Sequence, residues 1–300
     1  MTNSKRIFVF GASGFIGKYL KNKFSFDNSI EVLGGGAETH NLLSLDVQKV
    51  LLSAGSNDAV IIAAGISRIK ENSYESMIKN IQMIENFCRA ISKKSLKHIT
   101  FLSTVDVYGI DIKKSAIISE SFLPNPNDYY SVSKVVSEYL LKQICSKESI
   151  PLAILRLPGI YGPGDNFSST IGVLIRGALN EKKIVLHGKG DYLRNFVYVD
   201  DVYQIIQSAI KRKKSVLMNV ATIKSFAIKE IVKLIKNSLP FPVQIQHKER
   251  VLNIEKRAKY LQFDCSVAKK EFPDVCFTDL KTGVARYIKY ALEKQENRDT

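Results

Sequence analysis

The chain has 300 residues, 45% of them hydrophobic, which is enough for one large or two smaller domains with a sizeable core. Its four cysteines form no CxxC pair and its four histidines are scattered, so we expect neither a disulfide scaffold nor a metal site, and a reducing, cytoplasmic location. The net charge of +15 comes from lysines spread along the whole chain without interleaved aromatic residues, which indicates a solvated surface and not nucleic-acid binding. The longest apolar run, 59–66, is far shorter than the roughly 18 residues of a membrane span, so we expect no membrane association.

Short strand-like runs alternate with helix-like segments through the first half of the chain, and this alternation predicts a doubly wound parallel sheet of the Rossmann type, an α/β fold. The predicted strands are 7–10, 30–33, 59–64, 98–103 and 152–157. The pattern becomes irregular after Gly164, with helices predicted near 170–179, behind Asp200 and Asp201, and over 228–235. We expect a first domain over 1–160 and a smaller α+β domain over 161–300, with about 194–212 returning to the first.

A glycine-rich segment, Gly11-Ala12-Ser13-Gly14-Phe15-Ile16-Gly17, follows the first predicted strand and opens a helix. Glycines at these positions permit a tight turn and let backbone N–H groups approach a pyrophosphate at the positive end of the helix. Such a spacing arises by chance in roughly one chain of this length in twenty, so its place between a strand and a helix carries the prediction. We expect Gly11, Gly14, Phe15, Ile16 and Gly17 to bind a dinucleotide in the first domain.

The second predicted strand ends in Gly34-Gly35-Gly36, where dinucleotide-binding folds usually carry an acid that bonds the adenosine ribose. The missing acid removes a barrier to a 2′-phosphate, although no Arg or Lys follows before Lys49. We therefore expect NADP(H) in preference to NAD(H), with both left open. Asp46 could bond the adenine amino group or serve as an ordinary capping residue. Ala63, Ala64 and Gly65, at the end of a buried strand, would let the cofactor lie close.

Three Tyr-xxx-Lys pairs occur in the chain, and at least one is expected by chance, so only position separates them. Tyr130 begins a predicted helix in which Lys134 lies only about 40° away around the axis. The apolar residues of that helix lie roughly 140° to 280° away from Tyr130 around the axis, so we expect them to form the face that packs on the sheet and the Tyr130–Lys134 pair to lie on the opposite face. These apolar residues are Val132, Val135, Val136, Tyr139 and Leu140. Thr104 follows the strand over 98–103, at the edge of the sheet where ligands bind in such folds.

Five motifs, GASGFIG, STVDVYG, YSVSK, LRLPGIYGPG and LRNFVYVDD, occur in this order and spacing. Together they resemble the extended short-chain dehydrogenase/reductases, specifically the NAD(P)-dependent epimerase/dehydratase branch that acts on nucleotide sugars. The resemblance implies that the chain is an enzyme, a homodimer, with a nucleotide-diphosphate sugar as its substrate. It implies that Thr104, Tyr130 and Lys134 are catalytic, that Tyr130 and Lys134 also contact the cofactor, and that the substrate lies against Gly159, Phe167 and Arg194. On the residues alone Arg194 is an ordinary surface charge, with Lys183, Lys189, Arg250 and Arg257 as other candidates.

The chemistry that the resemblance implies is an interconversion of a ketone and an alcohol. A phenol with a pKa of about 10 is a poor base near neutrality, and we expect Lys134 and a positively charged nicotinamide ring to lower the pKa of Tyr130. Thr104 would hydrogen-bond the same substrate oxygen and orient it. Lys134 would also hold the nicotinamide ribose.

Departures from the family pattern narrow the expected reaction. Val105-Asp106 stands where the 4,6-dehydratases carry an Asp-Glu pair, so we expect no dehydration, and the added histidine of GDP-fucose synthase is missing after Phe167. Gly159 replaces an asparagine typical of galactose-type 4-epimerases. A 4-ketoreductase of a nucleotide-linked 4-keto-6-deoxyhexose remains as the first expectation and a 4-epimerase as the alternative. An inactive dinucleotide-binding sensor and a nucleic-acid-binding Rossmann protein are lesser alternatives.

Overall fold

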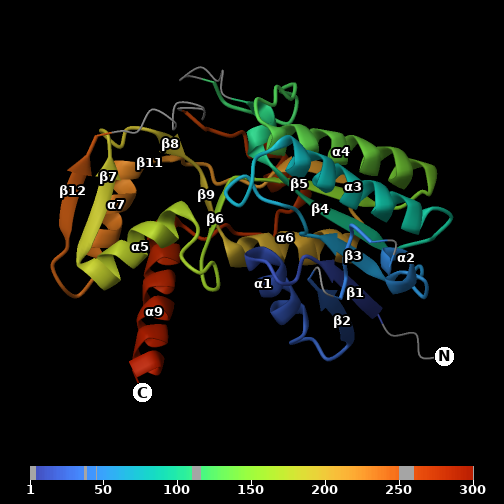
Figure 1. Ribbon diagram of the computed structural model, residues 1–300, viewed down its shortest axis with the longest axis horizontal. Coiled ribbons are helices and arrows are strands. Elements are labelled where there is room, and N and C mark those ends of the chain that lie inside the picture. Colours follow the sequence, from blue (N-terminus) through green and yellow to red (C-terminus); the bar gives the residue numbers. More distant parts are fainter. Residues whose placement is uncertain (1–4, 37–38, 45, 110–115, 250–259, 300) are drawn as a thin grey trace. The chain divides into compact units, whose positions relative to one another are not determined.

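The computed structural model describes residues 5–36, 39–44, 46–109, 116–249 and 260–299 (Figure 1). The chain divides into two compact units. Unit 1 comprises residues 1–109, 122–157 and 203–218, and unit 2 comprises 110–121, 158–202 and 219–300. The chain thus leaves unit 1 after Leu157 and returns to it at Tyr203.

Unit 1 is built on a six-stranded sheet in the order β10-β5-β4-β3-β1-β2. The pairs β2–β1, β1–β3, β3–β4 and β4–β5 are parallel, which confirms the predicted doubly wound sheet. The strands are β1 (Lys5–Phe10), β2 (Ile30–Gly35), β3 (Ala59–Ile62), β4 (His98–Thr104), β5 (Leu152–Leu157) and β10 (Val216–Asn219). All five predicted strands are present, but β3 ends two residues early, at Ile62, although Ala63 still donates its N–H to Phe10 O of β1 at 2.9 Å.

Helices cover both faces of this sheet, with α3 and α4 on one face and α1 and α6 on the other (Figure 1). The helices that pack on it, with one short 3₁₀ turn, are α1 (Phe15–Phe24), α2 (Asp46–Val50), α3 (Tyr74–Ile91), η1 (Val105–Tyr108), α4 (Tyr129–Lys147) and α6 (Val199–Arg212). The predicted apolar face of α6 is buried throughout, from Val202 to Ile210. Phe8, Phe10, Val60, Phe87 and Phe101 are among the buried residues between the sheet and the helices on the α3 side.

The prediction for the faces of α4 was wrong. The face that the helix buries is mostly polar and consists of Ser131, Ser133, Lys134, Ser137, Glu138, Leu141 and Cys145. Tyr139, from the expected packing stripe, is 63% exposed. Apolar periodicity misled here because the buried polar groups have partners inside the unit: Lys134 bonds the carbonyl of Leu102, and Glu138 pairs with Arg156.

Unit 2 contains three two-stranded sheets and four helices among its described residues. The parallel pairs are β6 (Gly159–Tyr161) with β9 (Phe196–Tyr198) and β7 (Lys183–His187) with β12 (Gln244–Lys248), and the antiparallel pair is β8 (Leu193–Arg194) with β11 (Phe226–Ala227). The helices are α5 (Thr170–Glu181), α7 (Ile228–Asn237), α8 (Ser266–Glu271) and α9 (Leu280–Asp299), so the helices predicted near 170–179 and 228–235 are confirmed. Side chains such as Tyr161, Ile175, Ile231, Val284 and Tyr287 form its core.

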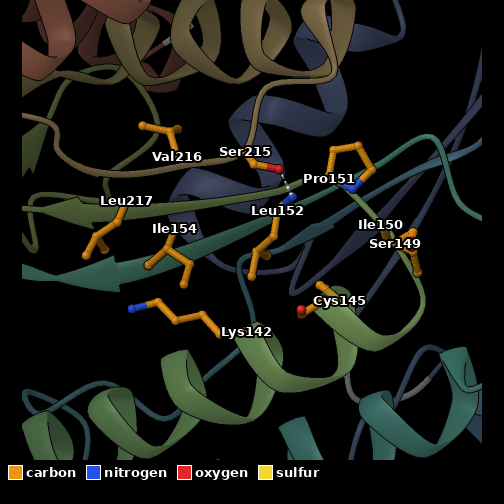
Figure 2. Close-up of a pocket in the computed structure, with 11 residues that line it drawn as sticks. Lys142, Cys145, Ser149, Ile150, Pro151, Leu152, Ile154, Ser215, Val216 and Leu217 are labelled. Carbon is orange, nitrogen blue, oxygen red and sulfur yellow. Dashed lines mark hydrogen bonds between the residues drawn. The ribbon is translucent and has the colours of Figure 1, made fainter.

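A pocket of about 490 Å³ lies in unit 1 beside the last turns of helix α4 and beside strands β5 and β10 (Figure 2). Its lining includes Lys142, Cys145, Leu152 and Leu217 but none of the residues predicted to bind cofactor or substrate. Within the described ranges, no helix combines the length and the hydrophobicity needed to cross a membrane. The same ranges contain no group of three or more His, Cys, Asp or Glu side chains arranged to hold a metal ion.

Candidate active site

The glycine-rich loop between β1 and α1 brings three backbone segments into contact. Gly11 has φ +84°, a conformation that favours glycine, and a Cβ there would lie 2.6 Å from the backbone nitrogen of Ala64. A Cβ on Gly17 would overlap the carbonyl oxygen of Gly11. These glycines are therefore required by the close approach of the loop to α1 and to the segment that follows β3.

The first turn of α1 is open to a ligand. Gly14 is its N-cap residue and provides no side-chain cap, and a Cβ at Gly14 would meet only the carbonyl oxygen of Gly11, at 3.4 Å. Ser13 and Gly14 are exposed. Backbone N–H groups at an uncapped helix N-terminus attract anions, so this cradle fits the diphosphate of a dinucleotide.

The segment after β3 passes close to α4. Gly65 has φ +155°, and a Cβ there would lie 3.7 Å from Lys134 Nζ. The amide of Asn80, from α3, accepts from Ile66 N at 2.7 Å and donates to Ile66 O at 3.0 Å, which holds this segment in place. Ala64 and Gly65 thus border the glycine loop on one side and Lys134 on the other.

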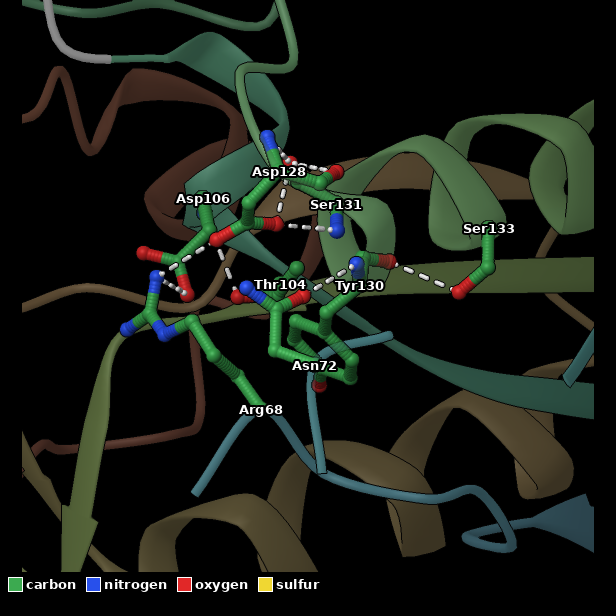
Figure 3. Close-up of polar contacts among 8 residues, drawn as sticks. All are labelled: Arg68, Asn72, Thr104, Asp106, Asp128, Tyr130, Ser131 and Ser133. Carbon is green, nitrogen blue, oxygen red and sulfur yellow. Dashed lines mark hydrogen bonds and ion pairs between the residues drawn. The ribbon is translucent and has the colours of Figure 1, made fainter. Parts of the chain in front are cut away.

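The end of β4 and the first two turns of α4 carry the three residues predicted to be catalytic. Lys134 is 7% exposed, donates to Leu102 O at 2.8 Å, and places its Nζ 5.8 Å from the ring centre of Tyr130. Thr104, the last residue of β4, stands two residues after Leu102 and is buried. Its hydroxyl accepts a hydrogen bond from Asp106 N at 3.2 Å. The backbone N–H of Tyr130 donates to Asn72 Oδ1 at 3.1 Å, so the start of α4 is tied to the chain ahead of α3 (Figure 3).

Two carboxylates and one guanidinium lie near enough to Tyr130 for their charges to act on its pKa, and none of the three was among the predicted site residues. Arg68 Nη1 lies 3.0 Å from Asp106 Oδ2 and 3.3 Å from Asp128 Oδ2 (Figure 3). Asp128 also caps α4 by accepting from Ser131 N at 2.7 Å. Two signals in the sequence could have indicated the carboxylates, since Asp106 lies inside STVDVYG and Asp128 stands two residues before Tyr130. No such signal was available for Arg68, which is 60 residues from Asp128 in the sequence.

Burial raises the pKa of Tyr130 above its usual value, and the negative charge of Asp106 raises it further while Arg68 opposes this. This direction is opposite to the one expected from Lys134, so the protein alone keeps the phenol protonated. Burial lowers the pKa of Lys134 to about 8, although the charge of Glu138 opposes the decrease. The pair therefore consists of a phenol that holds its proton and a lysine that can release one near neutral pH.

A buried ion pair joins α4 to β5. Glu138, one turn after Lys134, receives two bonds from Arg156 of β5, at 3.0 Å from Nε and 2.7 Å from Nη2. Ser103 donates to Glu138 Oε1 at 2.5 Å, and Arg156 Nη1 donates to Tyr108 OH at 2.9 Å. This network joins α4, β4, β5 and η1, and Arg156 is only 2% exposed.

The residues predicted to contact the substrate all lie in unit 2. Arg194, in β8, donates to Leu193 O at 2.9 Å, and its guanidinium lies 5.6 Å from the ring centre of Tyr192. A Cβ at Gly159 would lie 2.9 Å from the ring of Phe196, so close packing across β6 and β9 explains this glycine. Phe167 has φ +56° and stacks on Tyr287 at 5.9 Å. Their roles toward a substrate stay predictions.

The remaining candidates are exposed or partly exposed, or they lie outside the described residues. Asp46 begins α2, where it pairs with Lys49 at 2.9 Å and accepts from Ser44 at 2.7 Å, and its role toward adenine stays a prediction. Lys183 lies within 3.5 Å of Glu181. Arg250 and Arg257, the arginine alternatives to Arg194, lie outside the described residues.

Comparison with known proteins gives relatives with a range of activities. The chain is 27% identical over 243 residues to a dTDP-D-glucose 4,6-dehydratase from Dictyostelium discoideum, a match that covers 69% of this chain and 56% of that protein. It is 26% identical over 252 residues to a GDP-6-deoxy-D-talose 4-dehydrogenase from Aggregatibacter actinomycetemcomitans, covering 81% of this chain and 83% of the relative.

Solved structures with the same fold match almost the whole chain. A UDP-glucose 4-epimerase from Thermotoga maritima, solved with UDP-glucose, is 19% identical with a TM-score of 0.83 and covers 97% of this chain and 99% of its own. RMD from Pseudomonas aeruginosa, complexed with NADPH, is 21% identical with a TM-score of 0.81 and covers 95% and 99%. The model of the NAD dependent epimerase/dehydratase family matches residues 7–221. The chain therefore belongs to the NAD dependent epimerase/dehydratase family, and it is an enzyme of the short-chain dehydrogenase/reductase type.

Proposed function

We propose that the protein is a 4-ketoreductase that reduces a nucleotide-linked 4-keto-6-deoxyhexose with NADPH as the hydride donor. The observation that carries this proposal is the position of Tyr130 beside Lys134, whose Nζ lies 5.8 Å from the centre of the tyrosine ring, in surroundings where burial and the charge of Asp106 raise the pKa of the phenol. A reductase needs a proton donor beside the carbonyl oxygen, whereas oxidation needs a base at the same position. The relative from A. actinomycetemcomitans, named a 4-dehydrogenase of a GDP-linked 6-deoxy sugar, supports this substrate class.

In this proposal the bound dinucleotide supplies the hydride. The hydroxyl of Tyr130 donates its proton to the substrate oxygen as that oxygen gains electrons. Lys134, whose pKa lies at about 8, stabilises the resulting phenolate and can return a proton to it. Thr104, held at the end of β4 by its bond to Asp106 N, orients the same substrate oxygen. Arg194 binds the diphosphate of the nucleotide sugar.

The test is to incubate the purified protein with a panel of nucleotide-linked 4-keto-6-deoxyhexoses, each with NADPH or NADH. A reductase consumes about one dinucleotide per sugar reduced, seen as a loss of absorbance at about 340 nm. The alternative function, a nucleotide-sugar 4-epimerase, would interconvert two 4-hydroxyl epimers without net consumption of dinucleotide. That result, obtained with 4-hydroxyl sugars, would contradict the reductase proposal.

We also propose a cytoplasmic homodimer. All four cysteines, Cys88, Cys145, Cys265 and Cys276, are free thiols, as is usual in a reducing compartment. Light scattering of the purified protein, over a range of concentrations, measures the mass of the assembly directly. A mass equal to one chain at all concentrations would exclude the dimer.

A further inference from the structure

The carboxyl end of β2 carries a lysine from another element. Lys21, two turns into α1, is partly buried and donates its Nζ to the carbonyl oxygen of Gly34 at 3.1 Å. This contact places an ammonium group directly at the strand end where dinucleotide-binding folds hold the adenosine ribose. The residues that follow β2 in the sequence gave no sign of it, because Lys21 stands before the strand.

The glycines at this strand end are packed against the same groups. A Cβ at Gly34 would lie 3.2 Å from Lys21 Cδ and 3.1 Å from Ala12 Cβ, and a Cβ at Gly36 would lie 2.6 Å from Ser13 Oγ. A Cβ at Gly35 would overlap Thr39 and His40. An acidic side chain at positions 34 to 36 would therefore displace its neighbours, and the space is bordered by the hydroxyl of Ser13 and the stem of Lys21.

The ammonium of Lys21 has no carboxylate partner within ion-pair distance among the described residues. The positive charge of Lys21 also reaches His40, where together with burial it lowers the pKa of the imidazole. Within the part of the chain that the structure describes, the strand end thus presents a positive charge without a carboxylate partner beside the exposed hydroxyl of Ser13.

We propose that Lys21 and Ser13 bind the 2′-phosphate of NADP(H) and make the protein selective for NADP(H) over NAD(H). A phosphate dianion would replace the Gly34 carbonyl as the partner of Lys21 and would accept a hydrogen bond from Ser13. Charge-assisted bonds of this kind contribute about 1.5 to 3 kcal/mol, which corresponds to roughly a tenfold to hundredfold preference. The proposal rests on the dinucleotide site of the proposed function but needs no assumption about the sugar.

The test is calorimetric titration of the wild-type protein and three variants with NADP⁺ and with NAD⁺, without any sugar. We expect wild type to bind NADP⁺ at least about tenfold more tightly than NAD⁺. Lys21→Gln should lower the affinity for NADP⁺ about tenfold or more and leave that for NAD⁺ within about twofold, and Ser13→Ala should have the same selectivity with a smaller loss. Lys18→Gln, an exposed lysine one turn earlier in α1, removes the same charge and should change neither affinity.

Three results would overturn the proposal: equal or tighter binding of NAD⁺ by wild type, an equal loss of both affinities in Lys21→Gln, or no loss of either. Glu38→Gln adds a fourth measurement, since Glu38 follows β2 in the sequence but lies outside the described residues. If Glu38→Gln weakens NAD⁺ binding and wild type prefers NAD⁺, the ribose is held by an acid and not by Lys21. Because these are binding measurements, they stand whether or not the protein proves to be a ketoreductase.

Discussion

Helices α1 and α4 both pack on the sheet of unit 1, but they bury opposite kinds of side chain. The buried residues of α1 are Gly17, Leu20 and Phe24, and the helix leaves its first turn free of side-chain caps. The buried face of α4 consists mostly of serines, Lys134 and Glu138. The first helix is predicted to offer backbone N–H groups to a ligand, for which apolar packing is enough, whereas the second carries Tyr130 and Lys134, whose predicted roles depend on side chains in set positions.

The difference shows what each kind of burial contributes. Apolar packing is non-directional and allows small shifts in rotation or height of a helix. The contacts of α4 are directional: Lys134 to Leu102 O, and Glu138 to Arg156 and Ser103. They fix the rotation of α4 relative to β4, and therefore the place of Tyr130 relative to Thr104.

The largest effect should come from breaking the buried ion pair between Glu138 of α4 and Arg156 of β5. Arg156→Met leaves Glu138 as an unpaired buried carboxylate, so we expect the free energy of unfolding in urea to fall by about 3 to 5 kcal/mol. The double variant Arg156→Met/Glu138→Leu removes both charges and should recover part of the loss. A loss below about 1 kcal/mol in the single variant would show that the pair does not hold α4.

Tyr130→Phe keeps the ring and removes the hydroxyl. Once a substrate is known, we expect turnover to fall at least about a hundredfold, or about 2.7 kcal/mol, with dinucleotide affinity nearly unchanged. Tyr19→Phe and Tyr290→Phe are matched controls, because each also stands four residues before a lysine. Full turnover in Tyr130→Phe would remove Tyr130 from the reaction.

The buried lysine of α4 should make stability depend on pH. The folded-state pKa of Lys134 is about 8 against 10.5 for the free side chain, so between these values the unfolded chain binds more protons and stability rises with pH. From pH 8 to pH 10 the gain should be about 2 kcal/mol. Lys134→Met should lose this gain in urea titrations at the two pH values, and an identical pH dependence in both proteins would contradict the assignment.

The contrast between α1 and α4 also separates what the sequence could predict from what it could not. Strand runs such as 98–103 and the turn at Gly11–Gly17 follow from local patterns, and the structure confirms the strand and shows why the glycines are needed. The buried face of α4 depends on partners far along the chain, such as Arg156 for Glu138, so apolar periodicity selected the wrong face. Lys21 was missed because it precedes β2 in the sequence and reaches Gly34 only through the packing of α1.

The smallest effect should come from a buried serine that does not reach the sheet. Ser137 is 2% exposed, but its hydroxyl donates at 2.7 Å to Ser133 O, one turn earlier in α4 itself. The carbonyl oxygen of Ser133 can still accept a backbone hydrogen bond within the helix when the serine hydroxyl is removed, and alanine is a better helix former than serine. We therefore expect Ser137→Ala to change the free energy of unfolding by less than about 0.5 kcal/mol. Arg156→Met, measured in the same urea titration, provides the scale. If Ser137→Ala instead costs as much as Arg156→Met, buried polarity in α4 would stabilise the protein wherever it occurs. A small effect would mean that only the polar groups bridging α4 to β4 and β5 hold Tyr130 and Lys134 in place.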